Sequence, residues 1–195
     1  MAIPVTQGKL QTSISNMALG DYIAARYTTT AMTAHGTFAE IGTVDTTTVQ
    51  PFSSTNLDGY VYLIKIAKGV LMPNCRLYSS ITYATLNADN RIYGKKVTIG
   101  TKDFLIRVPK LNEVIAACGT LNGALDITDR TANFGVTMST ADVEIIQENY
   151  NLTQGLFQWA WSPATISNAG AYGSPAPARL VLEYSDDPKC TDLYH

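Results

Sequence analysis

The longest alternation of apolar residues in the chain lies between Asp58 and Met72, and it predicts a strand. Apolar side chains occupy both faces of this segment, with Tyr60 and Ile64 on one face and Val61 and Leu63 on the other. A strand that is apolar on both faces lies inside a sheet whose two faces are covered. We therefore expect Asp58–Met72 to be an internal strand.

Three further segments predict strands. Asp21–Thr30 alternates and ends in β-branched residues, which favour extended backbone. Lys95–Pro109 predicts a hairpin, because two alternating runs flank a short Gly-Thr-Lys turn. Pro177–Tyr184 is apolar on both faces, so we expect its part Arg179–Tyr184 to pair centrally in a sheet.

Helical patterns are fewer and shorter. A helical turn is expected before Gly20, and a weak helical stripe with Ser80 as a possible cap follows in Ser79–Asn87. Lys110–Gly119 has apolar residues at helical spacing and a terminal glycine. Ser139–Tyr150 combines an approximate capping box with an apolar face, which predicts a second helix.

These elements predict an α+β fold with mostly antiparallel strands and two or three short helices. A break is expected near residue 90, which would separate a β-rich N-terminal part (1–90, for docking or assembly) from a C-terminal part (91–195). The alternative is one continuous domain.

Composition narrows the range of partners. Only 15% of the 195 residues are charged, which is typical of proteins packed in assemblies or facing the outside of a cell, and also of an ordinary mildly polar domain. The net charge of −2 without a basic run argues against nucleic-acid binding. No segment has the length of a signal peptide or a membrane span, so we expect no membrane partner.

The side chains that carry chemistry are scattered along the chain. His35 and His195 have no neighbouring nucleophile in a recognisable order, which gives no support to a catalytic triad. The three cysteines, Cys75, Cys118 and Cys190, lack the spacing of a zinc site or a disulfide framework. We expect no cofactor and no catalytic residue.

Carboxylates are also sparse. Asp126 and Asp129 precede a glycine, but the other ligands of a calcium loop are missing, and a polar turn explains them better. Glu144 and Glu148, like the two aspartates, are the clearest carboxylate pairs for a hydrolase, and both pairs fit solvated faces. We therefore expect no metal.

Segments from Leu19 to Tyr184 follow an order that resembles a family of proteins encoded in the tail and structural modules of phages and prophages of Gram-positive bacteria. The segments are LGDYI, GTFAEIG, SITYATLN, GKKVTIG, WAW and ARLVLEY. The resemblance departs at Tyr83, where the family tends to have Trp, and in the final strand. It implies a C-type-lectin-like C-terminal part and a virion component near the host-contacting end, released by lysis after synthesis in the host cytoplasm.

Four functions remain open. The first is a tail fibre, baseplate or adhesin component that forms homo-oligomers, binds other virion proteins and contacts host cell-wall polysaccharide. The second is a capsid decoration, collar or connector protein without receptor binding. The third is a carbohydrate-binding module, and the fourth is a wall hydrolase or depolymerase.

The candidate ligand-binding residues lie in and beside a loop of small residues, Ser167–Pro177. Asn168 supplies an amide and Tyr172 an aromatic ring, a mixture that suits adaptable polar contacts. Trp161 and Trp159 share one face of a predicted strand, which favours a core-facing stripe over a ligand platform. Trp161 would then anchor the loop, and the alternative is a plain surface connection.

Overall fold

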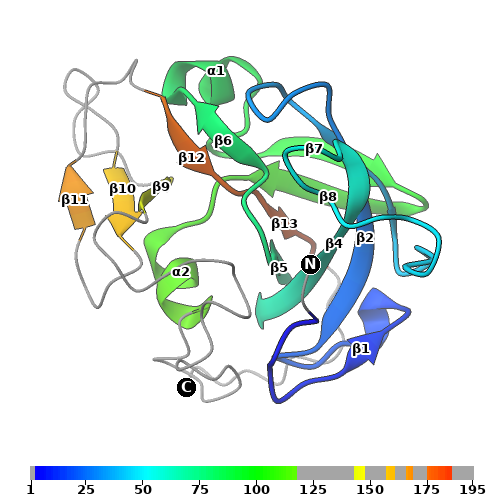
Figure 1. Ribbon diagram of the computed structural model, residues 1–195. Coiled ribbons are helices and arrows are strands. Elements are labelled where there is room, and N and C mark those ends of the chain that lie inside the picture. Colours follow the sequence, from blue (N-terminus) through cyan, green and yellow to red (C-terminus); the bar gives the residue numbers. More distant parts are fainter. Residues whose placement is uncertain (1–2, 118–142, 148–156, 161–165, 169–174, 186–195) are drawn as a thin grey trace, which may run out of the picture.

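The computed structural model describes residues 3–117, 143–147, 157–160, 166–168 and 175–185. These residues form a strand-rich α+β structure with two short α-helices and one 3₁₀ turn (Figure 1). The early elements are β1 (Leu10–Gln11), η1 (Ile14–Asn16), β2 (Tyr22–Thr28), β3 (Thr37–Ile41), β4 (Asp58–Ala67), β5 (Val70–Pro73), β6 (Tyr78–Ile81) and α1 (Tyr83–Ala88). The later ones are β7 (Lys95–Ile99), β8 (Lys102–Arg107), α2 (Leu111–Ala117), β9 (Val143–Ile145), β10 (Phe157–Ala160), β11 (Ile166–Asn168), β12 (Ala176–Ala178) and β13 (Val181–Glu183).

Eight strands form one mixed sheet in the order β1-β2-β4-β5-β13-β8-β7, with β3 also paired to β2. The pairs are antiparallel except for β1 with β2. The expected strand Arg179–Tyr184 corresponds to β13, which lies between β5 and β8, so its central position is confirmed. Strands on both sides of residue 90 are neighbours in this sheet.

The sheet curls until its two edges meet. β3 and β7 are at opposite ends of the pairing order, yet their Cα atoms come within 8 Å of each other. No ladder joins β3 to β7 among the described residues, so the sheet is an incompletely closed barrel. We call the line along which β3 and β7 face each other the seam.

Alternate side chains from these strands fill the interior of the barrel. Ile23, Tyr27, Leu63 and Ile106 belong to one buried cluster that also contains Phe38 of β3. The ring of Tyr27 packs 4.9 Å from that of Phe38, measured between centroids. The period of two along each strand therefore places one apolar face inside, as the sequence predicts for β4.

The outer face of the sheet is covered on one side. Ile64, Met72 and Val181 of β4, β5 and β13 pack with Val114 of α2 and Ile146, which follows β9. A second outer cluster joins Tyr60 and Tyr62 of β4, Ala24 of β2 and Val44 of the loop after β3. We call the region covered by α2 and β9 the sealed side.

Buried ion pairs hold the sealed side to the barrel. Arg179 is fully buried and donates from Nε and Nη2 to the two carboxylate oxygens of Glu144 in β9, at 2.6 and 2.7 Å. Arg107 of β8 binds Glu113 of α2, with 2.8 Å between Nη1 and Oε2, and donates from Nε to Glu183. Each arginine thus ties an outer element to a strand of the barrel.

Three local expectations were wrong. Asp58–Met72 is not one strand: it turns at Lys68 and Gly69, where φ is +63°, and returns as β5. Helix α1 is capped by Thr82 rather than Ser80, because the Thr82 hydroxyl accepts from the Thr85 amide.

The third error concerns Ser139–Tyr150. Within its described part, Val143–Ile145 forms the strand β9, paired with β10, where a helix was expected. The prediction relied on the helical spacing of the apolar residues. It did not take into account that Glu144 is buried and forms an ion pair with the buried guanidinium of Arg179. Tertiary ion pairing therefore overrides the local helical pattern.

The remaining elements agree with the sequence only in part, because the expected strand Pro177–Tyr184 is divided between β12, which pairs with β6 in a separate sheet, and β13 of the barrel. The turn before Gly20 is η1, the hairpin Lys95–Pro109 is β7 and β8, and Lys110–Gly119 contains α2 in its described part. None of the described helices is long and apolar enough to cross a membrane.

Candidate binding grooves along the seam

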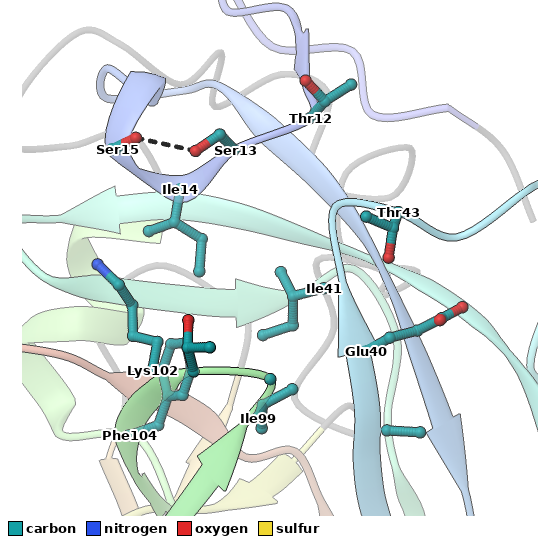
Figure 2. Close-up of a pocket in the computed structure, with 13 residues that line it drawn as sticks. Thr12, Ser13, Ile14, Ser15, Glu40, Ile41, Thr43, Ile99, Lys102 and Phe104 are labelled. Carbon is teal, nitrogen blue, oxygen red and sulfur yellow. Dashed lines mark hydrogen bonds between the residues drawn. The ribbon is translucent and has the colours of Figure 1, made fainter.

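Two cavities open along the seam, one toward each end of β3. The larger has a volume of about 350 Å³ and is lined by Ala39–Ile41 of β3, Thr12–Ser15, Thr43, the turn Ile99–Lys102 and Phe104 (Figure 2). Five of these lining residues carry hydroxyl groups: Thr12, Ser13, Ser15, Thr43 and Thr101. We call this cavity the hydroxyl groove.

The floor of the hydroxyl groove is apolar. Figure 2 shows Ile14, Ile41 and Ile99 pointing toward one another from η1, β3 and the end of β7. Ile14 is directed inward because η1 closes with a hydrogen bond from the Met17 amide to its carbonyl. The hydroxyl groove therefore offers an apolar base with hydroxyl groups around it.

Charged groups in the hydroxyl groove are few. Among its lining residues, Glu40 and Lys102 have ionisable side chains, and Figure 2 shows them on opposite sides of the groove. The Ser13 and Ser15 hydroxyls lie 2.8 Å apart and share a hydrogen bond. Such a set suits hydrogen bonding to a polar, uncharged ligand.

The second cavity, of about 320 Å³, lies toward the start of β3. Its lining residues are Gly36, Thr37, Phe38, Arg91, Lys95, Val97, Thr98 and Ile106. It contains two cationic side chains and no carboxylate in its lining. We call it the cationic pocket.

A hydrogen-bonded cluster lies behind the cationic pocket. Asp89 accepts from Arg91 Nε at 2.6 Å and from Lys95 Nζ at 2.5 Å. His35 contributes Nδ1, which is 3.4 Å from the Tyr78 hydroxyl, and Nε2, which is 3.2 Å from the carbonyl of Thr85. These residues come from the loop before β3, from β6, from α1 and from the segment that leads into β7.

The charges in this cluster perturb their neighbours. Burial, helped by the positive charge of Arg91, lowers the pKa of His35, while the Asp89 carboxylate opposes the change. Burial would raise the pKa of Asp89, but hydrogen bonds from Lys95 and Arg91 hold it below its usual range. His35 is therefore neutral, and Asp89 is ionised, at pH 7.

The residues predicted from sequence do not assemble into a described site. Asn168 is the last residue of β11 and pairs with Phe157 of β10. Trp161 and Tyr172 lie outside the described residues. The pair Asp126 and Asp129 lies outside them too, and no group of three metal-ligating side chains gathers in the described part of the chain.

The sequence analysis missed both grooves. Neither has a motif, because its residues come from β3, β7 and loops that are distant in sequence. It also missed Asp21, a buried carboxylate that accepts from the Lys9 and Ala18 amides and the Gln11 side chain. The interrupted run of hydroxyl residues at 12–15 was the one available signal for the hydroxyl groove.

The surroundings of Cys75 and Glu144 indicate structural roles for both side chains. Burial raises the pKa of the Cys75 thiol to about 12, so the thiolate is not populated at neutral pH. Glu144 forms ion pairs with Arg179 and Arg76, and it does not line either groove.

Comparison of the chain with protein-family models, with curated proteins and with solved structures found no match.

Proposed function

We propose that this protein is a structural component of a bacteriophage particle, a tail fibre, baseplate or adhesin subunit that contacts the host surface by binding rather than by catalysis. The observation that carries the proposal is the hydroxyl groove, an accessible cavity lined by five hydroxyl residues over an apolar floor. Polyhydroxylated chains such as cell-wall polysaccharide have the hydrogen-bonding groups that such a lining complements.

The order of the sequence segments supports the virion assignment. LGDYI leads into β2, GTFAEIG contains β3, GKKVTIG contains β7, and ARLVLEY contains β13, and all of these strands belong to the barrel. Gly20, the second residue of LGDYI, and Gly42, the last of GTFAEIG, have φ of +83° and +89°. These four of the six segments therefore belong to the framework of the barrel, whereas SITYATLN covers the end of β6 and α1 outside it.

We further propose that β9, β10 and β11 belong to a C-type-lectin-like C-terminal part. These strands form a separate antiparallel sheet beside the barrel (Figure 1). We propose Asn168, Trp161 and Tyr172 as ligand-binding residues of that part. Its proposed partners are further copies of the same chain, in a homo-oligomer, and other virion proteins.

The alternative is a capsid decoration, collar or connector protein without receptor binding. Its supporting observation is the pair of unjoined edges at β3 and β7, which offer backbone groups to a neighbouring subunit. Antibody labelling of intact particles separates the two functions. Label at the tail tip supports the adhesin, label on the capsid or neck supports the alternative, and absence of label from purified particles contradicts both.

Activity as a hydrolase or depolymerase is tested by a separate assay. Incubation of the purified protein with wall polysaccharide is expected to release no reducing ends. Release of reducing ends that continues with time would overturn the binding role.

A further inference from the structure

The cationic pocket has the features of a built site. Arg91 lines it although only 3% of the residue is exposed, and its guanidinium is fixed from behind. Nε donates to Asp89 and Nη1 to the Tyr78 hydroxyl, at 2.6 and 3.4 Å. Nη2 has no hydrogen-bond partner among the described residues, and this atom contacts solvent. A donor of the buried arginine is thus left to the pocket.

The charge of the cluster is not balanced. Arg91 and Lys95 face one carboxylate, that of Asp89, so one positive charge remains uncompensated while His35 is neutral. The Lys95 side chain lines the pocket with an exposed fraction of 40%, and its ammonium group binds Asp89. Thr37 and Thr98 line the pocket from the two facing strands, and the Thr98 hydroxyl donates to Asp103 at 2.7 Å.

We propose that the cationic pocket binds the anionic group of a ligand, a carboxylate or a phosphate, with Arg91 and Lys95 as its charged partners. The Arg91 Nη2 and Lys95 Nζ groups would donate to the anion. Thr37 would add a hydroxyl donor, and Phe38, Val97 and Ile106 would contact the uncharged body of the ligand. The proposal is independent of the hydroxyl groove and of the role in a phage particle.

The rigidity of the site favours this assignment. Asp89 holds both cations, so an incoming anion meets a guanidinium and an ammonium group that are already oriented. One wall of the pocket is tightly packed, because a Cβ atom added at Gly36 would overlap the Tyr27 ring. Little side-chain order would need to be gained on binding.

Titration of the folded protein with sodium phosphate and with sodium acetate tests the proposal, at constant ionic strength kept with sodium chloride. The signal is the ring resonance of His35 in a heteronuclear NMR spectrum, assigned by its loss in His35→Gln. We expect a saturable shift with at least one of the two anions. Because the anion offsets the charges of Arg91 and Lys95, the bound state should also raise the pKa of His35.

Two lysines on the same strand provide matched variants. Lys95→Gln removes a proposed ligand group and should weaken anion binding by about tenfold or more, the loss expected for one charge-assisted hydrogen bond. Lys96→Gln removes the same charge from the neighbouring position, where the side chain is 71% exposed and pairs with Asp103, and should leave binding unchanged. Arg91→Lys keeps the charge but removes the Nη2 donor, and a folded variant should bind more weakly.

The outcomes are distinct. Saturation with phosphate alone identifies a phosphate ligand, saturation with acetate alone identifies a carboxylate ligand, and each supports the site. A shift that is linear with both anions overturns the proposal, and so does equal weakening in Lys95→Gln and Lys96→Gln. Binding of wall polysaccharide at the hydroxyl groove has a separate readout, so failure of one proposal leaves the other measurable.

Discussion

The two sides of this barrel use their polar groups in opposite ways. On the sealed side, the buried side chains of Arg107 and Arg179 form ion pairs with carboxylates of α2 and β9. These charges are therefore paired inside the protein. Along the seam, hydroxyl groups and the cations Arg91 and Lys95 line cavities. We therefore expect stability to depend mainly on the sealed side, and the proposed ligand sites lie along the seam.

The cause of this difference lies in the sheet. β5 and β13 are paired on both sides, so their outer faces can be covered by packed elements without leaving a backbone edge open. β3 and β7 are each paired on one side only among the described residues. An edge that is not joined keeps room beside it, and the two cavities occupy that room.

The largest effect is expected for Glu144→Gln. This change removes the carboxylate that pairs with the buried guanidinium of Arg179, and breaking a buried ion pair on one side costs about 3–5 kcal/mol. Urea unfolding should show a matching fall in the free energy of unfolding. The control is Glu40→Gln in the hydroxyl groove, for which we expect less than about 0.5 kcal/mol. Equal losses in the two variants would contradict the division between the sides.

A smaller loss is expected for Gly36→Ala, which tests how closely the seam is packed. The added methyl group would overlap the Tyr27 ring, which is buried in the barrel. Overpacking of this kind costs about 1–3 kcal/mol, to be measured by urea unfolding. The matched control is Gly94→Ala, where an added methyl group meets only ordinary contacts with Leu105 but φ is +139°, so any loss there reports backbone strain alone. An unchanged stability in Gly36→Ala would show that the seam is loosely packed.

The pH dependence gives the smallest effect on stability. The pKa of His35 is lower in the folded protein than its ordinary value of 6.5, so the unfolded chain takes up a proton first as the pH falls. Stability should therefore decrease as the pH is lowered from about 6.5 through the depressed value. Thermal unfolding of the protein and of His35→Gln, followed between pH 7 and pH 5, should show a shallower decrease in the variant. Parallel curves would mean that His35 does not titrate in this range.

Much of the barrel could be predicted from the sequence, because period-two alternation in β2, β4, β7 and β8 directly reflects burial of one or both faces. The turn at Gly69 was missed since apolar residues continue on both sides of it. The strand β9 was missed because its partner Arg179 is 35 residues away, and local spacing carries no information about such a contact.

The candidate site was less predictable than the fold. Aromatic and amide residues near Asn168 attracted attention because their composition is typical of binding loops. The grooves consist instead of common residues such as Thr101 and Lys95, and only the meeting of β3 with β7 brings them together. Which edges meet is a property of the whole sheet, so no window of sequence contains it.

The central claim is that the seam recognises a ligand, and binding to cell-wall polysaccharide from Gram-positive hosts tests it most directly. Thr101→Trp places an indole at the exposed turn of the hydroxyl groove, and Thr33→Trp places the same indole at an exposed turn that lines neither described groove. We predict that the unchanged protein and Thr33→Trp bind the polysaccharide equally, and that Thr101→Trp binds at least about tenfold more weakly. Equal binding by all three proteins, or no binding by the unchanged protein to any wall preparation, would contradict the account.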